Sequence, residues 1–381
     1  MLVCELMHEN PNVYRIRVPF PNVVTNETNC FVVGDGSDAL VIDTGAPGSE
    51  SARGLTEALE RIGVELREAR FFLTHAHYDH AGLLPSVAPR GATVYVNARE
   101  LPSLQPGFGK VLAAYSCRRF QEEGGSHAAA CSASAAVVAS TELDLSGYEL
   151  FPVDEGDEIR VGRYVFKVVN TPGHTVGHMA LREERSGICF TGDHVLFVIT
   201  PGLAPRFGAG NALSAYIDSL RKISDLSCSR LFISHGECRL DFEDRIEHLI
   251  GHHERRCRSL EQVIAEADRA TAPRGLTGYE IIRRIPWRIP APLEECDELR
   301  RWSVYFQGIA MLDYLTQAGR IVRVRDEAPG QVVDDGFPCG AGRPAAASPA
   351  SDGDALPSAS VESESGAAVE CPRFVNRYLL A

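Results

Sequence analysis

Short apolar runs and helical patterns alternate over residues 1–240 of the chain. The apolar runs are rich in Val, Ile and Phe and are bounded by Gly, Pro, Asn or Asp, a pattern that predicts β-strands. The predicted strands cover residues 13–18, 30–33, 39–42, 70–74, 93–96, 164–169, 188–191 and 231–234. Helical spacing of apolar residues predicts helices at 51–62 and 212–223. Because a Gly34-Asp35-Gly36 turn joins two early strands, we expect an α/β fold with mixed sheets.

From residue 241 the pattern becomes helical. Apolar residues recur at helical spacing from Phe242 to Ile264 and predict one long amphipathic helix. A short helix at 277–284, capped by Thr277, and a third helix at 294–318 are predicted to follow. Residues 321–325 then have the composition of a strand. Three helices and a strand are similar in order to a winged-helix domain, so we predict a helical, winged-helix-like domain over 241–330.

The end of the chain and one internal segment are harder to interpret. Residues 331–370 contain much Gly, Ala, Ser and Pro and few large apolar residues, which predicts disorder. Residues 371–381 are strand-like again, and we hypothesise that they form the second strand of the wing. Residues 104–147 include Gly124-Gly125, and their sequence allows two interpretations. They could form a mobile loop or helical flap over a site, or a plain surface connection.

Composition narrows the class of protein. The chain has 381 residues, of which 44% are hydrophobic and 23% charged, as in a soluble globular protein with about two domains. The net charge of −13 argues against general attraction to nucleic acid or to an anionic membrane. Eleven cysteines without a CxxC pair, no signal-peptide pattern and no apolar run of membrane-spanning length predict a cytoplasmic protein.

The segment His-Ala-His-Tyr-Asp-His carries the clearest chemistry. His75, His77, Asp79 and His80 provide four metal-capable side chains within six positions, directly after an apolar run. Alternate residues of an extended segment point the same way, so His75 and His77 can share one metal while Asp79 and His80 turn toward another. A solvated histidine-rich loop is the alternative. We favour a metal because partners of the right chemistry follow downstream.

Four further ligand-type side chains follow apolar strands after one or more small or turn residues. They are Asp43, His174, Asp193 and His235. An α/β scaffold builds a site in this way, with rigid strands that place polar groups at one rim. The sequence therefore predicts that these residues meet the 75–80 segment.

This ordered set resembles the metallo-β-lactamase superfamily. The resemblance lies in VIDTG with Asp43, THAHYDHAG, TPGHTVGH with His174, FTGDH with Asp193, and ISHGE with His235. It covers residues 1–240 and implies an αββα sandwich as the catalytic domain. The last motif differs from the family's usual Pro-Gly-His-Gly, but His235 is kept.

The resemblance also implies a ligand set. His75, His77 and His174 would hold one metal, Asp79, His80 and His235 a second, and Asp193 would bridge the two. Asp43 is expected to orient the ligand loop, while His178 and His194 are expected either to orient a ligand, to contact substrate or to be structural. Nitrogen-rich ligands favour two Zn²⁺, with Fe or Mn as alternatives.

Such a centre predicts hydrolysis. Two divalent metals supply a bridging hydroxide at neutral pH and stabilise negative charge on a carbonyl or phosphoryl oxygen. Asp79 is the candidate catalytic residue, because it can orient the nucleophile and pass a proton to the leaving group.

Several functions remain open at this point. An ester or thioester hydrolase acting on a small molecule, as in relatives of hydroxyacylglutathione hydrolase (glyoxalase II), is favoured. An endoribonuclease or phosphodiesterase ranks second. Residues 241–325 hold 14 Arg but also 14 acidic residues, and a region with this balance of charge is poorly suited to bind the phosphates of a nucleic acid. A β-lactamase and a non-catalytic metal-binding protein are less favoured. No membrane partner is expected, and the aromatic stripe around Trp302 suits either a core or a homodimer contact.

Overall fold

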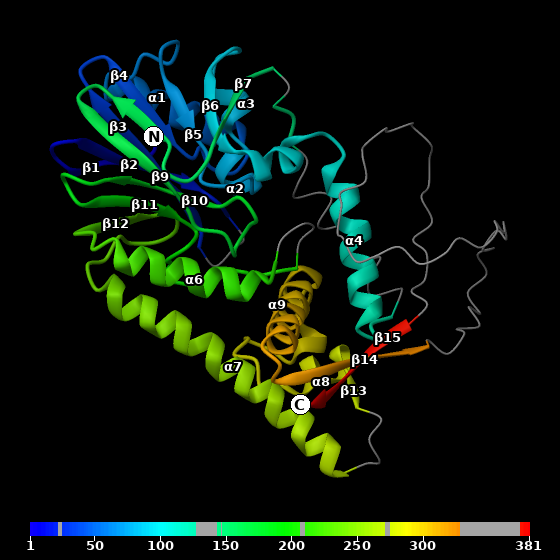
Figure 1. Cartoon of the computed structure of the whole chain (residues 1–381). Coiled ribbons are helices and arrows are strands. Elements are labelled where there is room, and N and C mark those ends of the chain that lie inside the picture. Colours follow the sequence, from blue (N-terminus) through cyan, green and yellow to red (C-terminus); the bar gives the residue numbers. More distant parts are fainter. Residues whose placement is uncertain (22–24, 127–142, 146, 206–209, 271–274, 328–373) are drawn as a thin grey trace, which may run out of the picture.

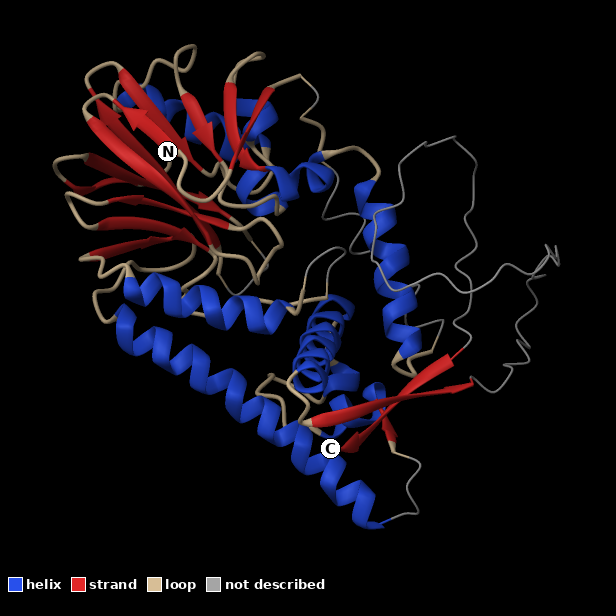
Figure 2. Ribbon diagram, viewed as in Figure 1, coloured by secondary structure: helices blue, strands red, loops and turns tan. Residues whose placement is uncertain are grey.

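Two β-sheets packed face to face form the larger part of the molecule (Figures 1 and 2). The computed structural model describes residues 1–21, 25–126, 143–145, 147–205, 210–270, 275–327 and 374–381, and the statements below concern these residues. The predicted disorder of 331–370 lies outside them, as does part of the segment 104–147.

The first sheet has seven strands in chain order. They are β1 (Cys4–His8), β2 (Asn12–Pro19), β3 (Glu27–Asp35), β4 (Asp38–Ile42), β5 (Arg70–Phe72), β6 (Thr93–Asn97) and β7 (Glu149–Val153). Strands β1 to β4 are antiparallel and β4 to β7 are parallel. The expectation of mixed sheets is confirmed.

The second sheet has five strands in the order β12-β11-β10-β9-β8. They are β8 (Glu158–Val161), β9 (Tyr164–Asn170), β10 (Met179–Glu183), β11 (Ile188–Gly192) and β12 (Arg230–Ile233). Strands β11 and β12 are parallel, and the other pairs of these described strands are antiparallel. Between the sheets, Phe31 contacts both Phe190 and Phe232, with ring centroids 5.5 and 5.3 Å apart. This buried aromatic cluster joins the two sheets.

Helices cover the outer face of each sheet (Figure 2). The first sheet carries α1 (Ser49–Arg61) and the short α2 (Tyr78–Ala81) and α3 (Leu84–Val87), and the second carries α6 (Ala212–Asp225). Helix α1 buries Leu55, Ala58 and Leu59, which recur at helical spacing. The predicted αββα sandwich is confirmed.

The helical region after β12 packs against α6. It contains α7 (Phe242–Ala270), α8 (Gly278–Arg284), η2 (Leu293–Glu295) and α9 (Glu298–Gln317). Leu249 of α7, Leu213 of α6 and Ile309 of α9 are fully buried in one apolar cluster. The boundary predicted at residue 240 therefore lies between two elements, but the apolar core continues across it.

A three-stranded sheet completes this region, in the order β13-β15-β14. It consists of β13 (Leu276–Thr277), β14 (Ile321–Glu327) and β15 (Phe374–Leu380). β15 pairs antiparallel with β14 from Ile321↔Leu380 to Glu327↔Phe374. The strand hypothesised at the end of the chain is thus present and lies against the strand proposed as its partner.

Buried polar groups fasten β15 to α4 (Phe108–Glu122), which follows the 3-10 helix η1 (Ala98–Leu104). The carboxylate of Glu123, at the end of α4, accepts hydrogen bonds from Tyr378 Oη and Asn376 Nδ2, both at 2.9 Å. Arg119 on α4 pairs with Asp313 on α9 at 3.2 Å. The described part of 104–147 therefore includes a helix that contacts the C-terminal region.

Two predicted boundaries were wrong, for local reasons. The helix predicted at 294–318 is interrupted, because the side chain of Asp297 accepts a hydrogen bond from Arg300 N at 2.8 Å and starts α9. The strand predicted at 70–74 ends at Phe72, because Thr74 N donates to the Asp43 side chain and not to a neighbouring strand. Among the described residues, no helix has the length and apolar character needed to cross a membrane.

Candidate metal centre

Strand register brings the ligand-type residues to one edge of the sandwich. In the first sheet Ile42 lies beside Phe72, so Asp43 and the 75–80 loop leave the sheet together. In the second sheet Gly192 lies beside Ile233, so Asp193 and His235 also emerge together. This is the physical basis of the rim that the sequence predicts.

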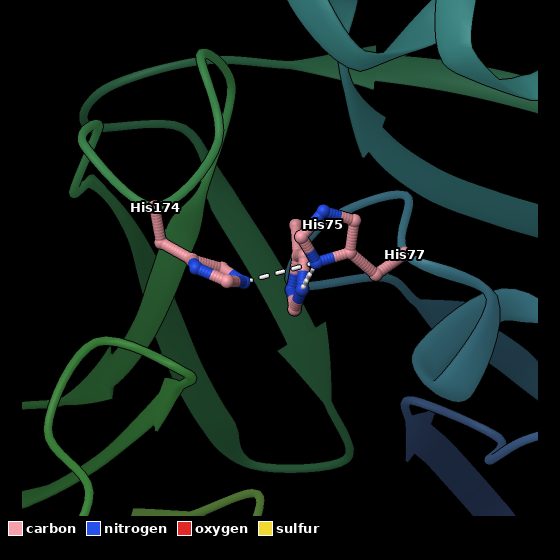
Figure 3. Close-up of side chains that lie close together, drawn as sticks. All are labelled: His75, His77 and His174. Atoms are coloured by element: carbon pink, nitrogen blue, oxygen red, sulfur yellow. Dashed lines mark hydrogen bonds between the residues drawn. The ribbon is translucent and has the colours of Figure 1, made fainter. Parts of the chain in front are cut away.

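Three histidines form the first group (Figure 3). The Nε2 atom of His75 lies 3.0 Å from Nδ1 of His77, and that same Nδ1 lies 2.9 Å from Nε2 of His174. His75 is fully buried, and His174 is 8% exposed. The three nitrogens converge on one point from loops almost 100 residues apart in the sequence.

Asp79, His80 and His235 form the second group, and Asp193 lies between the two groups. Nε2 of His235 is 3.4 Å from Oδ2 of Asp79 and 3.2 Å from Oδ1 of Asp193. The other oxygen of Asp193, Oδ2, is 3.6 Å from Nε2 of His174. Asp193 therefore directs one oxygen toward each group, the arrangement expected of a bridging carboxylate.

The outward ring nitrogens of the histidines are held by oxygen atoms. Nδ1 of His174 lies 2.8 Å from the Gly202 carbonyl oxygen, and Nδ1 of His235 lies 2.7 Å from the Glu27 carbonyl oxygen. Nδ1 of His80 lies 2.8 Å from Oδ2 of Asp43. With Nδ1 held by an oxygen on the outside, each of these three rings directs its Nε2 inward, and Nε2 is the atom that would bind a metal once it carries no proton.

Asp43 occupies a backbone position with φ of 57°, a conformation that Asp tolerates better than most residues. Its carboxylate accepts hydrogen bonds from the backbone N and Oγ1 of Thr74, both at 2.8 Å, in addition to the contact with His80. Asp43 thus connects the end of β4 to the segment that carries His75 and His80.

In the second group, burial and neighbouring charges shift the pKa values of His80 and His235 in opposite directions. Burial disfavours the charged form of His80, but Asp193, Asp79 and Asp43 outweigh it and raise the pKa of this imidazole well above its usual value. Likewise, burial opposes the charge of His235, yet Asp193 and Asp79 raise its pKa to about 10. The acidic groups therefore favour positive charge here.

In the first group, the pKa of His75 shifts in the opposite direction. Burial lowers the pKa of His75 well below its usual value, and the neighbouring histidines His80, His77 and His174 lower it further. A neutral imidazole is the form that binds a metal. His75 is therefore ready to coordinate a cation without first losing a proton.

The residues fit a pair of metal ions. Within the described part of the chain, Nε2 of His80 and Oδ1 of Asp193 are buried and have no hydrogen-bond partner, which is costly unless a ligand satisfies them. Zinc–nitrogen bonds of about 2.0–2.1 Å in a tetrahedral site place ligand nitrogens roughly 3.3 Å apart, close to the spacing in the first group. Five histidines and two carboxylates suit zinc.

The remaining two histidines have different surroundings. His178 is fully buried, with Nδ1 2.7 Å from Thr171 Oγ1, and its Nε2 accepts a hydrogen bond from the backbone N of Asp193 at 3.2 Å. It therefore supports the loop that carries Asp193. The ring of His194 makes no hydrogen bond to any described residue and packs against Tyr216, with centroids 4.8 Å apart, so it is part of the core.

Two supports of the ligand loops were not predicted from the sequence. Asn29 on β3 donates from Nδ2 to the carbonyl oxygens of Ile233 and Gly236, on either side of His235, at 2.9 and 2.8 Å. Glu100 on η1 accepts hydrogen bonds from Ala76 N and Gly177 N. Asn29 lies at the start of a strand and Glu100 follows the strand predicted at 93–96, but no sequence motif marks either residue.

Comparison with known proteins relates this chain to the family that its motifs resemble. The family model of the metallo-β-lactamase superfamily matches residues 24–235. The lactamase-like protein nscB of Trichophyton rubrum is 26% identical over 304 residues, which are 76% of this chain and 77% of that protein. An atrochrysone carboxyl ACP thioesterase of Emericella nidulans is 26% identical over 255 residues, 67% of this chain and 65% of that protein.

Solved structures share the fold. A β-lactamase domain protein from Burkholderia ambifaria has a TM-score of 0.69 and 19% identity, over 99% of this chain and 94% of that one. A metallo-β-lactamase family protein from Thermus thermophilus has a TM-score of 0.63 and 21% identity, over 82% and 95%. With its αββα sandwich and a family match that covers more than half of its length, the chain belongs to the metallo-β-lactamase superfamily.

Proposed function

We propose that this protein is a metal-dependent hydrolase of thioesters. The observation that carries the proposal is the convergence of seven ligand-type side chains. Within it, Nε2 of His80 and Oδ1 of Asp193 are buried 3.4 Å apart, and neither atom makes a hydrogen bond to a described residue. His75, His77 and His174 would hold one metal ion and the second group the other, with Asp193 between them. When bound, two divalent ions would supply hydroxide at neutral pH and Lewis acidity toward a carbonyl oxygen.

Asp79 is the candidate acid–base residue. Its side chain is 13% exposed, more than that of His80 or Asp193, so it can reach both solvent and substrate. Burial opposes its charge, but His80 and His235 lower its pKa, which keeps it ionised. An ionised Asp79 can orient the attacking water and then pass its proton to the leaving group.

Apolar side chains beside the ligands support an acyl substrate. Val198 is 50% exposed and lies close to Gly236, the residue that follows His235. A Cβ built on Gly236 would be only 3.0 Å from Cγ1 of Val198. Tyr78, between His77 and Asp79, packs against Phe20 with centroids 5.3 Å apart. The relative named as an ACP thioesterase points to the same class of bond.

A substrate panel tests the proposal. Zinc-loaded protein should hydrolyse acyl thioesters and leave bis-p-nitrophenyl phosphate and single-stranded RNA intact. Asp79→Asn should lower thioester turnover by about 10²–10⁴-fold, the usual contribution of acid–base catalysis. Asp218→Asn, an exposed carboxylate on α6, is the matched control and should leave turnover unchanged. Cleavage of RNA without thioester turnover would overturn the proposal in favour of a nuclease.

A further inference from the structure

Glu100 joins two loops that carry the first group of histidines. Its Oε2 accepts a hydrogen bond from Ala76 N at 3.0 Å, and its Oε1 accepts one from Gly177 N at 2.7 Å. Ala76 lies between His75 and His77, and Gly177 lies three residues after His174. One carboxylate therefore spans the 75–80 loop of the first sheet and the 171–178 loop of the second.

The position of Glu100 is fixed by its own surroundings. It lies in the first turn of η1, which begins when Asn97 Oδ1 accepts a hydrogen bond from Arg99 N at 2.9 Å. A Cβ added to Gly177 would lie only 2.9 Å from Glu100 Cγ. The close approach of the 171–178 loop to this carboxylate therefore requires glycine at position 177.

Among the described residues, the charge of Glu100 has no partner of opposite sign. The side chain is 2% exposed, and in this part of the chain its hydrogen bonds come from the two backbone amides and from no Arg or Lys. A buried carboxylate is costly unless hydrogen bonds and a nearby cation compensate it. A metal ion held by His75, His77 and His174 would be such a cation, because Ala76 lies between two of these ligands.

We infer that Glu100 is a positioning residue for the three-histidine metal site. It fixes the relative placement of the two loops and adds negative potential beside the bound cation. The inference rests on the proposed metal centre. Glu100 acts through backbone amides and does not touch a metal or the substrate, so its effect should appear in metal binding before it appears in chemistry.

The test compares Glu100→Gln with Glu183→Gln. Glu183 is also 2% exposed and accepts hydrogen bonds from Ser186 N and Oγ, but it lies at the far end of β10. A glutamine at position 100 can accept from only one of the two amides, because its NH₂ faces the other donor. Metal affinity is measured by competition with a chelator, and ligand geometry by the visible spectrum of the cobalt(II)-substituted protein.

We expect Glu100→Gln to bind the metal of the three-histidine site about 10–100-fold less tightly, as for other groups that orient ligands. Its cobalt spectrum should change, whereas Glu183→Gln should match the wild type in both measurements. In the metal-free Glu100→Ala chain, hydrogen exchange at the amides of Ala76 and Gly177 should accelerate selectively. Unchanged affinity and spectrum in Glu100→Gln would overturn the inference alone. A wild-type chain that binds no metal would overturn the proposed centre as well.

Discussion

Oδ2 of Asp43 lies 2.8 Å from Nδ1 of His80, and both side chains are buried. The contact joins the end of β4 to the loop that follows β5. Because Nδ1 donates to the carboxylate of Asp43, Nε2 is the nitrogen of His80 that faces Asp193. A residue outside the candidate ligand set thus determines which nitrogen of His80 faces the candidate metal site.

Substitution of Asp43 by Asn should weaken metal binding without changing the backbone. Asn tolerates the positive φ of this position, so the backbone conformation should be kept. The substitution removes the negative charge and one hydrogen-bond acceptor. The affinity for the second metal should fall by about 10–100-fold, as measured by chelator competition. Asp38→Asn, at the other end of β4, is the control. Wild-type affinity in Asp43→Asn would contradict the orienting role of this residue.

Removal of metal should destabilise the fold. Binding to the folded state alone adds about 4 kcal/mol when free metal is roughly 1,000 times the dissociation constant. Treatment with a chelator should therefore lower the melting temperature, and zinc should restore it. Magnesium should not, because it prefers oxygen ligands and this centre has five histidines. A melting temperature unaffected by the chelator would argue that the loops are stable without a cation.

His253 should make the protein sensitive to mild acid. This residue of α7 is fully buried, both ring nitrogens lack a hydrogen-bond partner among the described residues, and burial lowers its pKa to about 3. The unfolded chain takes up a proton at His253 near pH 6.5 and the folded chain does not. Stability is therefore lost as the pH falls below about 6.5, by roughly 2 kcal/mol at pH 5 for this one residue.

The variant His253→Leu should remove this loss. Replacement of a buried, unpaired imidazole by an apolar side chain of similar size should leave stability at pH 7 equal or higher. At pH 5 the variant should be more stable than the wild type by about 2 kcal/mol. Urea unfolding of the metal-free proteins at the two pH values measures the difference. Equal pH dependence in both chains would show that His253 is protonated in the folded state.

Tyr378→Phe should destabilise the C-terminal region. Tyr378 is fully buried and donates to Oε2 of Glu123, which is itself buried. Loss of the hydroxyl leaves that carboxylate with fewer donors, at a cost of about 1–3 kcal/mol. Val322→Thr, on the exposed face of the neighbouring strand, should change stability by less than about 0.5 kcal/mol. Urea unfolding compares the two, and equal effects would contradict the importance of the Glu123 contact.

The sequence predicted the strands that end in ligand-type side chains because those strands are short, apolar and followed by turn residues. The capping box of α8, in which Thr277 and Glu280 bond to each other's backbone, was likewise predicted in part from Thr277 alone. These features depend on residues close together in the chain. Local patterns are therefore sufficient to predict them.

Glu100 and His178 could not be assigned from sequence for the opposite reason. Glu100 acquires its role only when the loops of the two sheets meet around it, and its partners are backbone amides of any residue type. His178 resembles a ligand in its motif, yet its Nε2 accepts a hydrogen bond from the backbone of Asp193. Only three-dimensional contacts separate a histidine that binds a metal from one that supports a neighbouring loop.

The pairing of β15 with β14 has a consequence for the order in which the protein can fold during synthesis. Helix α4 is translated early, but the partners of its Glu123 are Asn376 and Tyr378, which lie 253 and 255 positions later. The αββα sandwich can form while the C-terminal sheet still lacks its central strand. In an incompletely translated chain the edge of β14 is therefore unpaired and the Glu123 carboxylate lacks these two donors. An unpaired strand edge favours aggregation.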